Sequence, residues 1–337
     1  MSSLNNLSFD LKPLKPLNAE LKEKIQAEKS GQKLNFQPRA FFQFFSWLNR
    51  IQGKKQAQLL NIDILSFAGD HGINAEFATP RFRSGEFLME AMRQETMPEL
   101  WKGNLSLQHY WVDLGVDYAF ESNISYWLNH NNKLINSKIK ARTESFSSYP
   151  AMTDDELAEA FYSGRKLVDR AHYQEKDLLV LHSLGEGQIF SVYALAWALS
   201  ISDAKAWTQY LPAWLGREVE QEIQRLAKKH PISHNPFTNL CFYGGFESVA
   251  LCGAIIRAAE KGIPFLLADP MAIIAWQYAA KIVPGVEQYG FAVGTFAEHL
   301  SKDYGSFKEN MSYTASGREW YPFIWKMQQE LRQYNAQ

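Results

Sequence analysis

The chain has 337 residues, and its 35 basic and 36 acidic side chains leave a net charge of −1, so no overall field is present to hold nucleic acid or an anionic membrane. Hydrophobic residues make up 46% and charged residues 21%, which is typical of a globular protein and argues against a disordered or fibrous chain. A single α/β domain with a small appendage and two average domains both fit this length.

Neither membrane attachment nor a disulfide framework is predicted. The first thirty residues lack an apolar signal core, and the longest apolar run, Ile189 to Ile201, is too short to span a bilayer. Cys241 and Cys252 are the two cysteines of the chain, which favours small buried thiols over disulfides or metal ligands. We therefore expect a cytoplasmic protein.

The N-terminal residues predict an arm followed by helices. Residues 1–18 mix Ser, Asn, Pro and Lys without periodicity, which is typical of a flexible arm, and helical patterns follow over 19–29 and 41–51. We expect residues 19–55 and 305–337 to form a small helical lobe. Residues 56–304 are expected to form the large α/β domain.

Short apolar runs with the length of buried strands recur along the chain, and helical patterns separate most of them. The runs are Ile62–Ala68, Leu107–Leu114, Asp177–Leu184, Ile263–Ala268 and Tyr289–Val293. The clearest helix start is Thr153, which Glu156 follows at the spacing of a capping box. Strands that alternate with long helices predict a mostly parallel, doubly wound, Rossmann-like α/β sheet with helices on both faces. In such a sheet, ligands bind at the carboxyl ends of the strands.

The first candidate loop follows the first strand, where Gly69 and Gly72 bracket Asp70 and His71. Glycines let the backbone approach a ligand closely, and the acid can orient the imidazole or accept ligand hydroxyls. A plain turn remains the alternative, because Asp and Gly are also common turn residues. A metal site is disfavoured, since this segment has one histidine and only Glu76 to assist it.

The second candidate loop is Gly185-Glu186-Gly187, between a strand and an apolar helix. The free amides at a helix N-terminus bind phosphate. A dinucleotide-binding motif would need its third glycine at the position of Phe190, so a dinucleotide site is not predicted. A P-loop is not predicted either, because no Lys-Ser/Thr pair follows. Glu186 would repel a phosphate, so we expect it to face a ribose hydroxyl or a developing cation.

The third candidate loop is Gly244-Gly245 at the start of a helix that ends near Lys261, and Asp269 ends a further strand. A tight helix–sheet junction is the alternative explanation for the two glycines. Since the carboxyl ends of parallel strands share one edge, we expect the residues of these loops to converge at one cleft. They are Asp70, Gly185, Glu186, Gly244, Gly245 and Asp269.

Several segments match one known family in order and spacing. They are Phe67–Ile73, Val112–Val116, Ala151–Thr153, Gly185–Glu186, Gly244–Glu247 and Pro264–Asp269. Over about residues 20 to 300 the chain resembles the nicotinate-nucleotide:dimethylbenzimidazole phosphoribosyltransferases, whose aspartate-histidine-glycine motif corresponds to Asp70-His71-Gly72.

The resemblance implies an activity and roles for named residues. The activity is transfer of phosphoribose from nicotinate mononucleotide to dimethylbenzimidazole or a related flat base, in cobamide lower-ligand activation, with no metal or redox cofactor and in a homodimer. Glu186 matches a family position that binds the nucleotide, and we expect it to be the catalytic residue because the family's C-terminal glutamate has no counterpart here. The implied substrate-binding residues are Asp70, His71, Gly72, Thr79, Gly185, Gly187, Ser191, Gly244, Gly245 and Asp269.

The chain departs from the family pattern at four places. Leu34 to Phe41 replace a glycine-rich stretch, Gln188 and Phe190 replace two loop glycines, and Leu88 replaces a glutamine of the base-pocket helix. Residues Tyr313 to Gly317 stand where the family has its general-base glutamate, and they contain no carboxylate. The competing expectation is therefore a weakened paralogue that binds a nucleotide or aromatic base without efficient turnover.

Overall fold

The computed structural model describes residues 9–17, 39–77, 83–93, 105–120, 132–199, 213–229, 232–267, 269–293, 306–307 and 320–336. Within these ranges, seven parallel strands form one sheet in the order β3-β2-β1-β4-β5-β6-β7. The strands are β1 (Asn61–Gly69), β2 (Ser106–Gly115), β3 (Asn132–Asn136), β4 (Leu178–Leu184), β5 (Phe265–Leu267), β6 (Gly290–Val293) and β7 (Ser306–Phe307). The strand order reverses between β1 and β4, as in doubly wound sheets, so the predicted fold class is confirmed.

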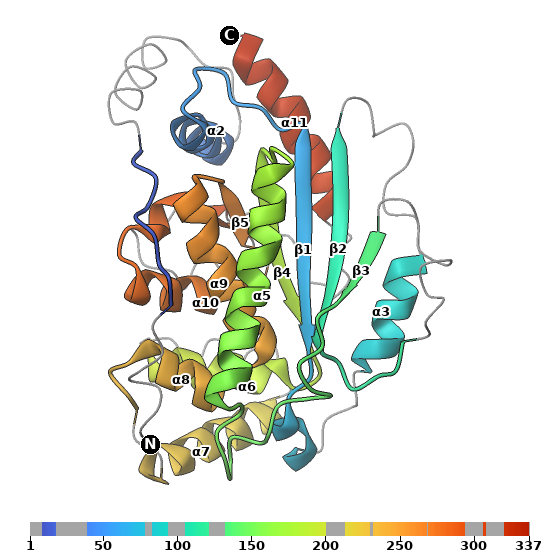
Figure 1. The fold of residues 1–337 in the computed structure, drawn as a ribbon, viewed down its shortest axis with the longest axis vertical. Helices are drawn as coiled ribbons and strands as arrows, with labels where there is room; N and C mark the ends of the chain where they lie inside the picture. The colour runs from blue at the N-terminus through green and yellow to red at the C-terminus, as the bar shows by residue number, and fades with distance from the viewer. Residues whose placement is uncertain are drawn as a thin grey trace.

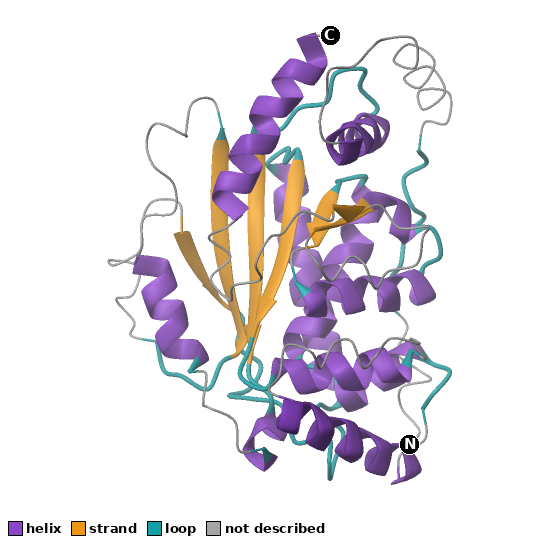
Figure 2. Ribbon diagram, turned by 180° about the vertical axis from the view of Figure 1, so that it is seen from behind, coloured by secondary structure: helices purple, strands orange, loops and turns teal. Residues whose placement is uncertain are grey.

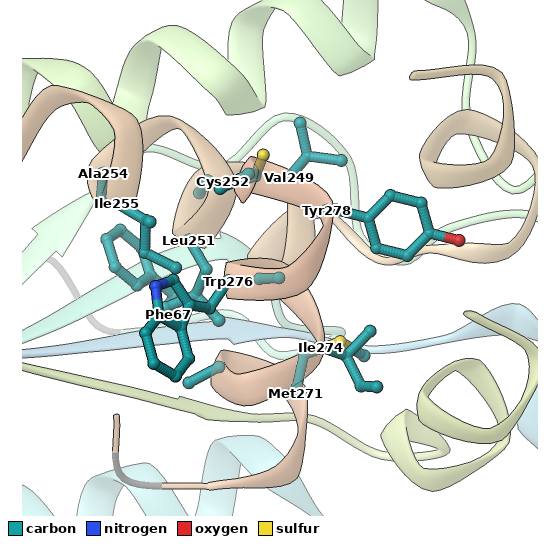
Figure 3. Packing of buried hydrophobic residues seen from close by; sticks show 14 of the residues in the cluster. Phe67, Val249, Leu251, Cys252, Ala254, Ile255, Met271, Ile274, Trp276 and Tyr278 are labelled. Carbon is teal, nitrogen blue, oxygen red and sulfur yellow. The ribbon is translucent and has the colours of Figure 1, made fainter. Parts of the chain in front are cut away.

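One face of the sheet carries the larger core. Helices α5 (Asp154–Tyr173), α9 (Phe246–Lys261) and α10 (Pro270–Ile282) cover this face, which is turned to the viewer in Figure 1. Leu65 and Phe67 of β1 pack there against Leu251 of α9 and Ile274 of α10, as the close view in Figure 3 shows for Phe67 and its neighbours. These side chains are fully buried, and this removal of apolar area from water holds the helices on the sheet.

The opposite face is covered by helices from both ends of the chain. Helices α2 (Arg39–Gln52) and α11 (Trp320–Ala336) share a core with Ile62 and Ile64 of β1, and the rings of Phe45 and Tyr334 lie 5.2 Å apart. Figure 2 shows α11 crossing this face of the sheet. The two helices form the predicted lobe from the termini, and the boundaries of that lobe remain a prediction. Farther along the same face, α3 (Ser84–Arg93) packs on Ala68 and Trp111.

Three helices and a short turn lie beyond the carboxyl ends of the central strands. They are η2 (Gly72–Glu76), α6 (Gln188–Ala198), α7 (Ala213–Lys229) and α8 (Pro236–Tyr243). A second short turn, η5 (Val286–Tyr289), leads into β6. Helix α5 begins as predicted: the Thr153 hydroxyl accepts from the Glu156 amide, and Glu156 accepts from the Thr153 amide at 2.8 Å. None of the described helices is long and apolar enough to cross a bilayer.

Residues 9–17 differ from the flexible arm that the sequence predicts for residues 1–18. The Phe9 ring lies 4.2 Å from that of Phe161, and the Lys12 amide donates to Glu260 at 2.9 Å. Arg165 donates to the Asp10 carbonyl at 3.0 Å. The segment is extended and is held by scattered contacts with α5 and α9, which leave no periodic pattern in its sequence.

Candidate active site

The three candidate loops meet at the carboxyl ends of β1 and β4. The first loop follows β1, the second joins β4 to α6, and the third joins α8 to α9. In Figure 1 the arrowheads of β1, β2 and β4 point towards η2 and α6, so the loops lie at one edge of the sheet. Because the strand order reverses between β1 and β4, the main chain diverges here and leaves functional groups at the edge.

Glu186 has a fixed main chain and a partly exposed side chain. Its amide donates to Asp70 Oδ1 and to Ser84 Oγ, both at 2.9 Å, and its carbonyl accepts from the His71 amide at 2.9 Å. Its carboxylate Oε1 accepts from Asn74 Nδ2 at 2.7 Å. A carboxylate on a main chain held at three points is placed in advance for electrostatic work on a ligand.

Asp70 joins two strand ends. Its side chain is 5% exposed, Oδ1 accepts from Glu186, and Oδ2 accepts from the Asp117 amide at 2.8 Å. Burial raises the pKa of Asp70, while hydrogen bonds from Ser84 and Glu186 oppose the rise. The two oxygens thus hold the Glu186 loop to the segment after β2.

His71 is bonded at both ring nitrogens. Nε2 lies 2.7 Å from Glu247 Oε1, and Nδ1 lies 2.7 Å from Ser191 Oγ. All three side chains are buried. We call this set of Ser191, His71 and Glu247 the histidine chain, and it connects the end of β1 to α6 and α9.

Glu247 is the member of the histidine chain that the predicted site residues do not include. It occupies the first turn of α9, where the helix dipole favours a negative charge. A sequence signal exists, because an acid directly follows Gly244-Gly245-Phe246 at a predicted helix start. Its partner is 176 residues away, and that separation hides the pairing from the sequence.

Two of the predicted glycines have structural reasons to be glycine. Gly187 has a φ of +78°, a left-handed conformation that side chains rarely adopt. A Cβ on Gly245 would lie 2.4 Å from His71 Cε1 and 2.3 Å from Glu247 Oε2, so this glycine makes room for the histidine chain. The other predicted glycines each lie against a backbone carbonyl: Gly72 against Thr143, Gly185 against Gly69 and Gly244 against Leu240.

Asp269 lies behind the Glu186 loop. It is fully buried at the N-cap of α10, Oδ2 accepts from the Ser183 amide at 2.7 Å, and Oδ1 accepts from the Ser183 hydroxyl at 2.8 Å and the Ala272 amide at 3.0 Å. Burial raises the pKa of Asp269 to about 7, and these hydrogen bonds oppose the rise. Asp269 thus reaches the site through Ser183, whose hydroxyl also accepts from Gln188 at 2.7 Å.

The two side chains that replace family glycines point into the protein. Gln188 donates to Ser183, and the Phe190 ring stacks on that of Phe77 with centroids 4.2 Å apart.

The structure brings the six residues that were expected to converge to one edge of the sheet. Two of them, Asp70 and Asp269, have their carboxylates bonded to protein groups. Thr79 and Tyr313 to Gly317 lie outside the described residues.

Within the parts of the chain that the structure describes, no group of three or more His, Cys, Asp or Glu side chains is arranged to hold a metal ion. The chemistry available at this edge is that of a half-buried carboxylate, helix N-termini and a buried histidine.

Comparisons with known proteins agree with the architecture. A family model described as phosphoribosyltransferase matches residues 17–305. The nicotinate-nucleotide–dimethylbenzimidazole phosphoribosyltransferase of Pseudomonas aeruginosa is 28% identical over 248 residues, which cover 72% of this chain and 68% of that protein. The protein of the same name from Thermus thermophilus is 26% identical over 268 residues, which cover 77% and 75%. A crystal structure of the Thermus thermophilus enzyme has the same fold, with a TM-score of 0.73 at 20% identity over 94% of this chain and 96% of that one.

Proposed function

The chain belongs to the phosphoribosyltransferase family whose model spans residues 17–305, and from this premise we propose that it transfers phosphoribose from nicotinate mononucleotide to dimethylbenzimidazole or a related flat base. In the proposed reaction a ring nitrogen of the base bonds to the anomeric carbon and the bond to nicotinate breaks. The base loses its ring N–H proton to water, and the products are nicotinate, an α-ribazole-type phosphate and this proton.

The observation that carries the proposal is the placement of Glu186. Positive charge grows at the anomeric carbon as nicotinate leaves, and a fixed carboxylate beside that carbon lowers the barrier. Two observations support Glu186 in this role: its main chain is held by Asp70, His71 and Ser84, and its side chain is partly exposed. The start of α6 lies next to it, and the dipole of this helix favours an anion such as the phosphate at that end.

The test is whether nicotinate release depends on a base. Purified protein is incubated with nicotinate mononucleotide, with and without dimethylbenzimidazole, and nicotinate is measured by chromatography. We expect release only when the base is present. Equal release in both samples would indicate hydrolysis and would overturn the assignment of a transferase.

The second candidate is a weakened paralogue that binds the nucleotide or an aromatic base without efficient turnover. The sequence from Tyr313 to Gly317 favours it, because this stretch has no carboxylate where the family has its general base. General base assistance supplies ~10²–10⁴ in rate. Calorimetry that detects binding of either ligand, combined with no release of nicotinate, would select this candidate.

We place the proposed reaction in the cytoplasm and assign it to a homodimer. Cys241 and Cys252, which are free and buried, support a reducing compartment. Light scattering of the purified protein tests the assembly, and a monomer mass would contradict the dimer.

A further inference from the structure

Glu247 is a fully buried carboxylate with no role in the proposed chemistry so far. Its side chain is 0% exposed, and among the described residues Oε2 has no hydrogen-bond partner. A buried carboxylate with a single bonded oxygen is costly to keep. Within the described part of the chain, the hydrogen bond of the Glu247 side chain is made to His71, so the effect of Glu247 is exerted on that ring.

The His71 ring is fixed from two helices. Glu247 belongs to the first turn of α9, and Ser191 lies near the start of α6. The His71 tautomer with its hydrogen on Nε2 donates to Glu247 Oε1, and in this tautomer Nδ1 accepts from the Ser191 hydroxyl. Neither nitrogen is left for a ligand, and the His71 side chain is 1% exposed.

The main chain of residues 70 and 71 connects this ring to Glu186. The His71 amide donates to the Glu186 carbonyl, and the Asp70 carboxylate accepts from the Glu186 amide, both at 2.9 Å. The His71 main chain therefore carries both the buried ring and one of the bonds that hold Glu186, so a displacement of the ring that shifts this main chain also shifts Glu186.

We propose that Glu247 is a positioning residue, which acts through His71 to hold Glu186 in the geometry that phosphoribosyl transfer requires, with Ser191 as the second anchor. This inference rests on the proposed function for its kinetic test. A misplacement of about 1 Å in a catalytic group lowers the rate by as much as ~10²-fold.

The kinetic test compares Glu247→Gln, Ser191→Ala, Glu186→Gln and the double variant of Glu186→Gln with Glu247→Gln. We expect Glu247→Gln and Ser191→Ala each to lower kcat by ~10–10²-fold, with KM for nicotinate mononucleotide changed by less than ~3-fold. Because Glu247 acts through Glu186, the double variant should be no slower than Glu186→Gln alone. Losses that multiply in the double variant would overturn the proposal.

Ser66→Ala is the matched control. Ser66 is also fully buried, and its hydroxyl lies 2.7 Å from His109 Nε2 and 3.0 Å from His182 Nδ1. It lies on the face of β1 that carries Ile62 and Ile64. Its loss should lower the unfolding temperature and leave kcat unchanged well below that temperature. An equal fall of kcat in Ser66→Ala would show that any buried serine–histidine bond has this effect, and would overturn the specific role of the histidine chain.

Hydrogen exchange measured by mass spectrometry supplies a readout that needs no turnover. The amides of His71 and Glu186 are both hydrogen-bonded in the structure. In Glu247→Gln and Ser191→Ala, peptides with these amides should exchange ~10-fold faster, and in Ser66→Ala they should exchange as in the parent. Unchanged exchange in both Glu247→Gln and Ser191→Ala would overturn the proposal, even if the parent protein releases no nicotinate.

Discussion

At the residue scale, Glu186 is the side chain on which the proposed chemistry depends. Glu186→Gln keeps the size of the side chain and removes its charge, so turnover should fall by ~10²-fold or more while the unfolding temperature changes little. The measurement is nicotinate release under saturating substrates. Glu319→Gln is assayed beside it, since Glu319 is the nearest carboxylate beyond Tyr313 to Gly317. Unchanged turnover in Glu186→Gln would remove Glu186 from the mechanism.

Asp269 should give the protein a distinct dependence of stability on pH. Its pKa is raised from 3.8 to about 7, so the folded protein keeps a proton between these pH values that the unfolded chain releases. The folded state thus binds more protons in this window, and Asp269 makes the free energy of unfolding fall as pH rises from about 4 to about 7. The difference between the two pKa values changes the free energy of unfolding by at most ~4 kcal/mol over this pH range.

Chemical denaturation at several pH values checks this expectation. Asn cannot titrate, so in Asp269→Asn the free energy of unfolding should no longer fall in this way as pH rises. Asp155→Asn, at an exposed position of α5, should keep the fall. The same slope in Asp269→Asn and in the parent would show that Asp269 is ionised throughout the window, as its three hydrogen-bond donors favour.

At the element scale, the start of α6 is the proposed site for the nucleotide phosphate. Gln188 and Phe190 add side chains where the family has glycines, but these side chains contact Ser183 and Phe77. The structure supplies another reason: the Gln188 and Phe190 amides already donate to the carbonyls of Gly185 and Gly187, at 3.3 and 3.1 Å. A phosphate must compete with these bonds.

Nicotinate mononucleotide should therefore bind at least ~10-fold more weakly here than to a family member with the full glycine loop. Calorimetry on both proteins measures the difference. Gln188→Gly removes the side-chain bond to Ser183 that helps to hold the loop, so the loop amides should turn to the phosphate more easily and binding should tighten. Equal affinity of the two unmodified proteins would contradict the expectation and would mean that the loop binds phosphate in another way.

The strands with continuous apolar runs could be predicted from the sequence, and others could not. The runs at 62–68 and 107–114 lie within β1 and β2, because central strands are buried on both faces. The sequence does not predict strand β3, because this strand has only two apolar residues, Leu134 and Ile135, and lies at the edge of the sheet. Helix α8 was missed because it has only eight residues and few turns in which to show periodicity.

At the scale of the whole molecule, topology explains why the site could be located but not assigned in detail. Parallel strands carry their following loops to one edge, so the convergence of Asp70, Glu186 and Asp269, which follow β1, β4 and β5, could be expected from the sequence. Gly245 follows helix α8 instead, so this rule does not explain its place at the edge. Which oxygens face a ligand depends on contacts between distant residues, as between Asp70 and Asp117 or Glu247 and His71. No local pattern contains that information.

The most direct test of the account is the identity of the product. Mass spectrometry is applied after the protein has been incubated with nicotinate mononucleotide and dimethylbenzimidazole, with Glu186→Gln as the control. We predict a compound in which the phosphoribosyl group is joined to the base, formed in equal amount to nicotinate and ~10²-fold more slowly by the variant. Unchanged nucleotide, or ribose phosphate without attached base, would contradict the claim that this chain is a phosphoribosyltransferase acting on these substrates.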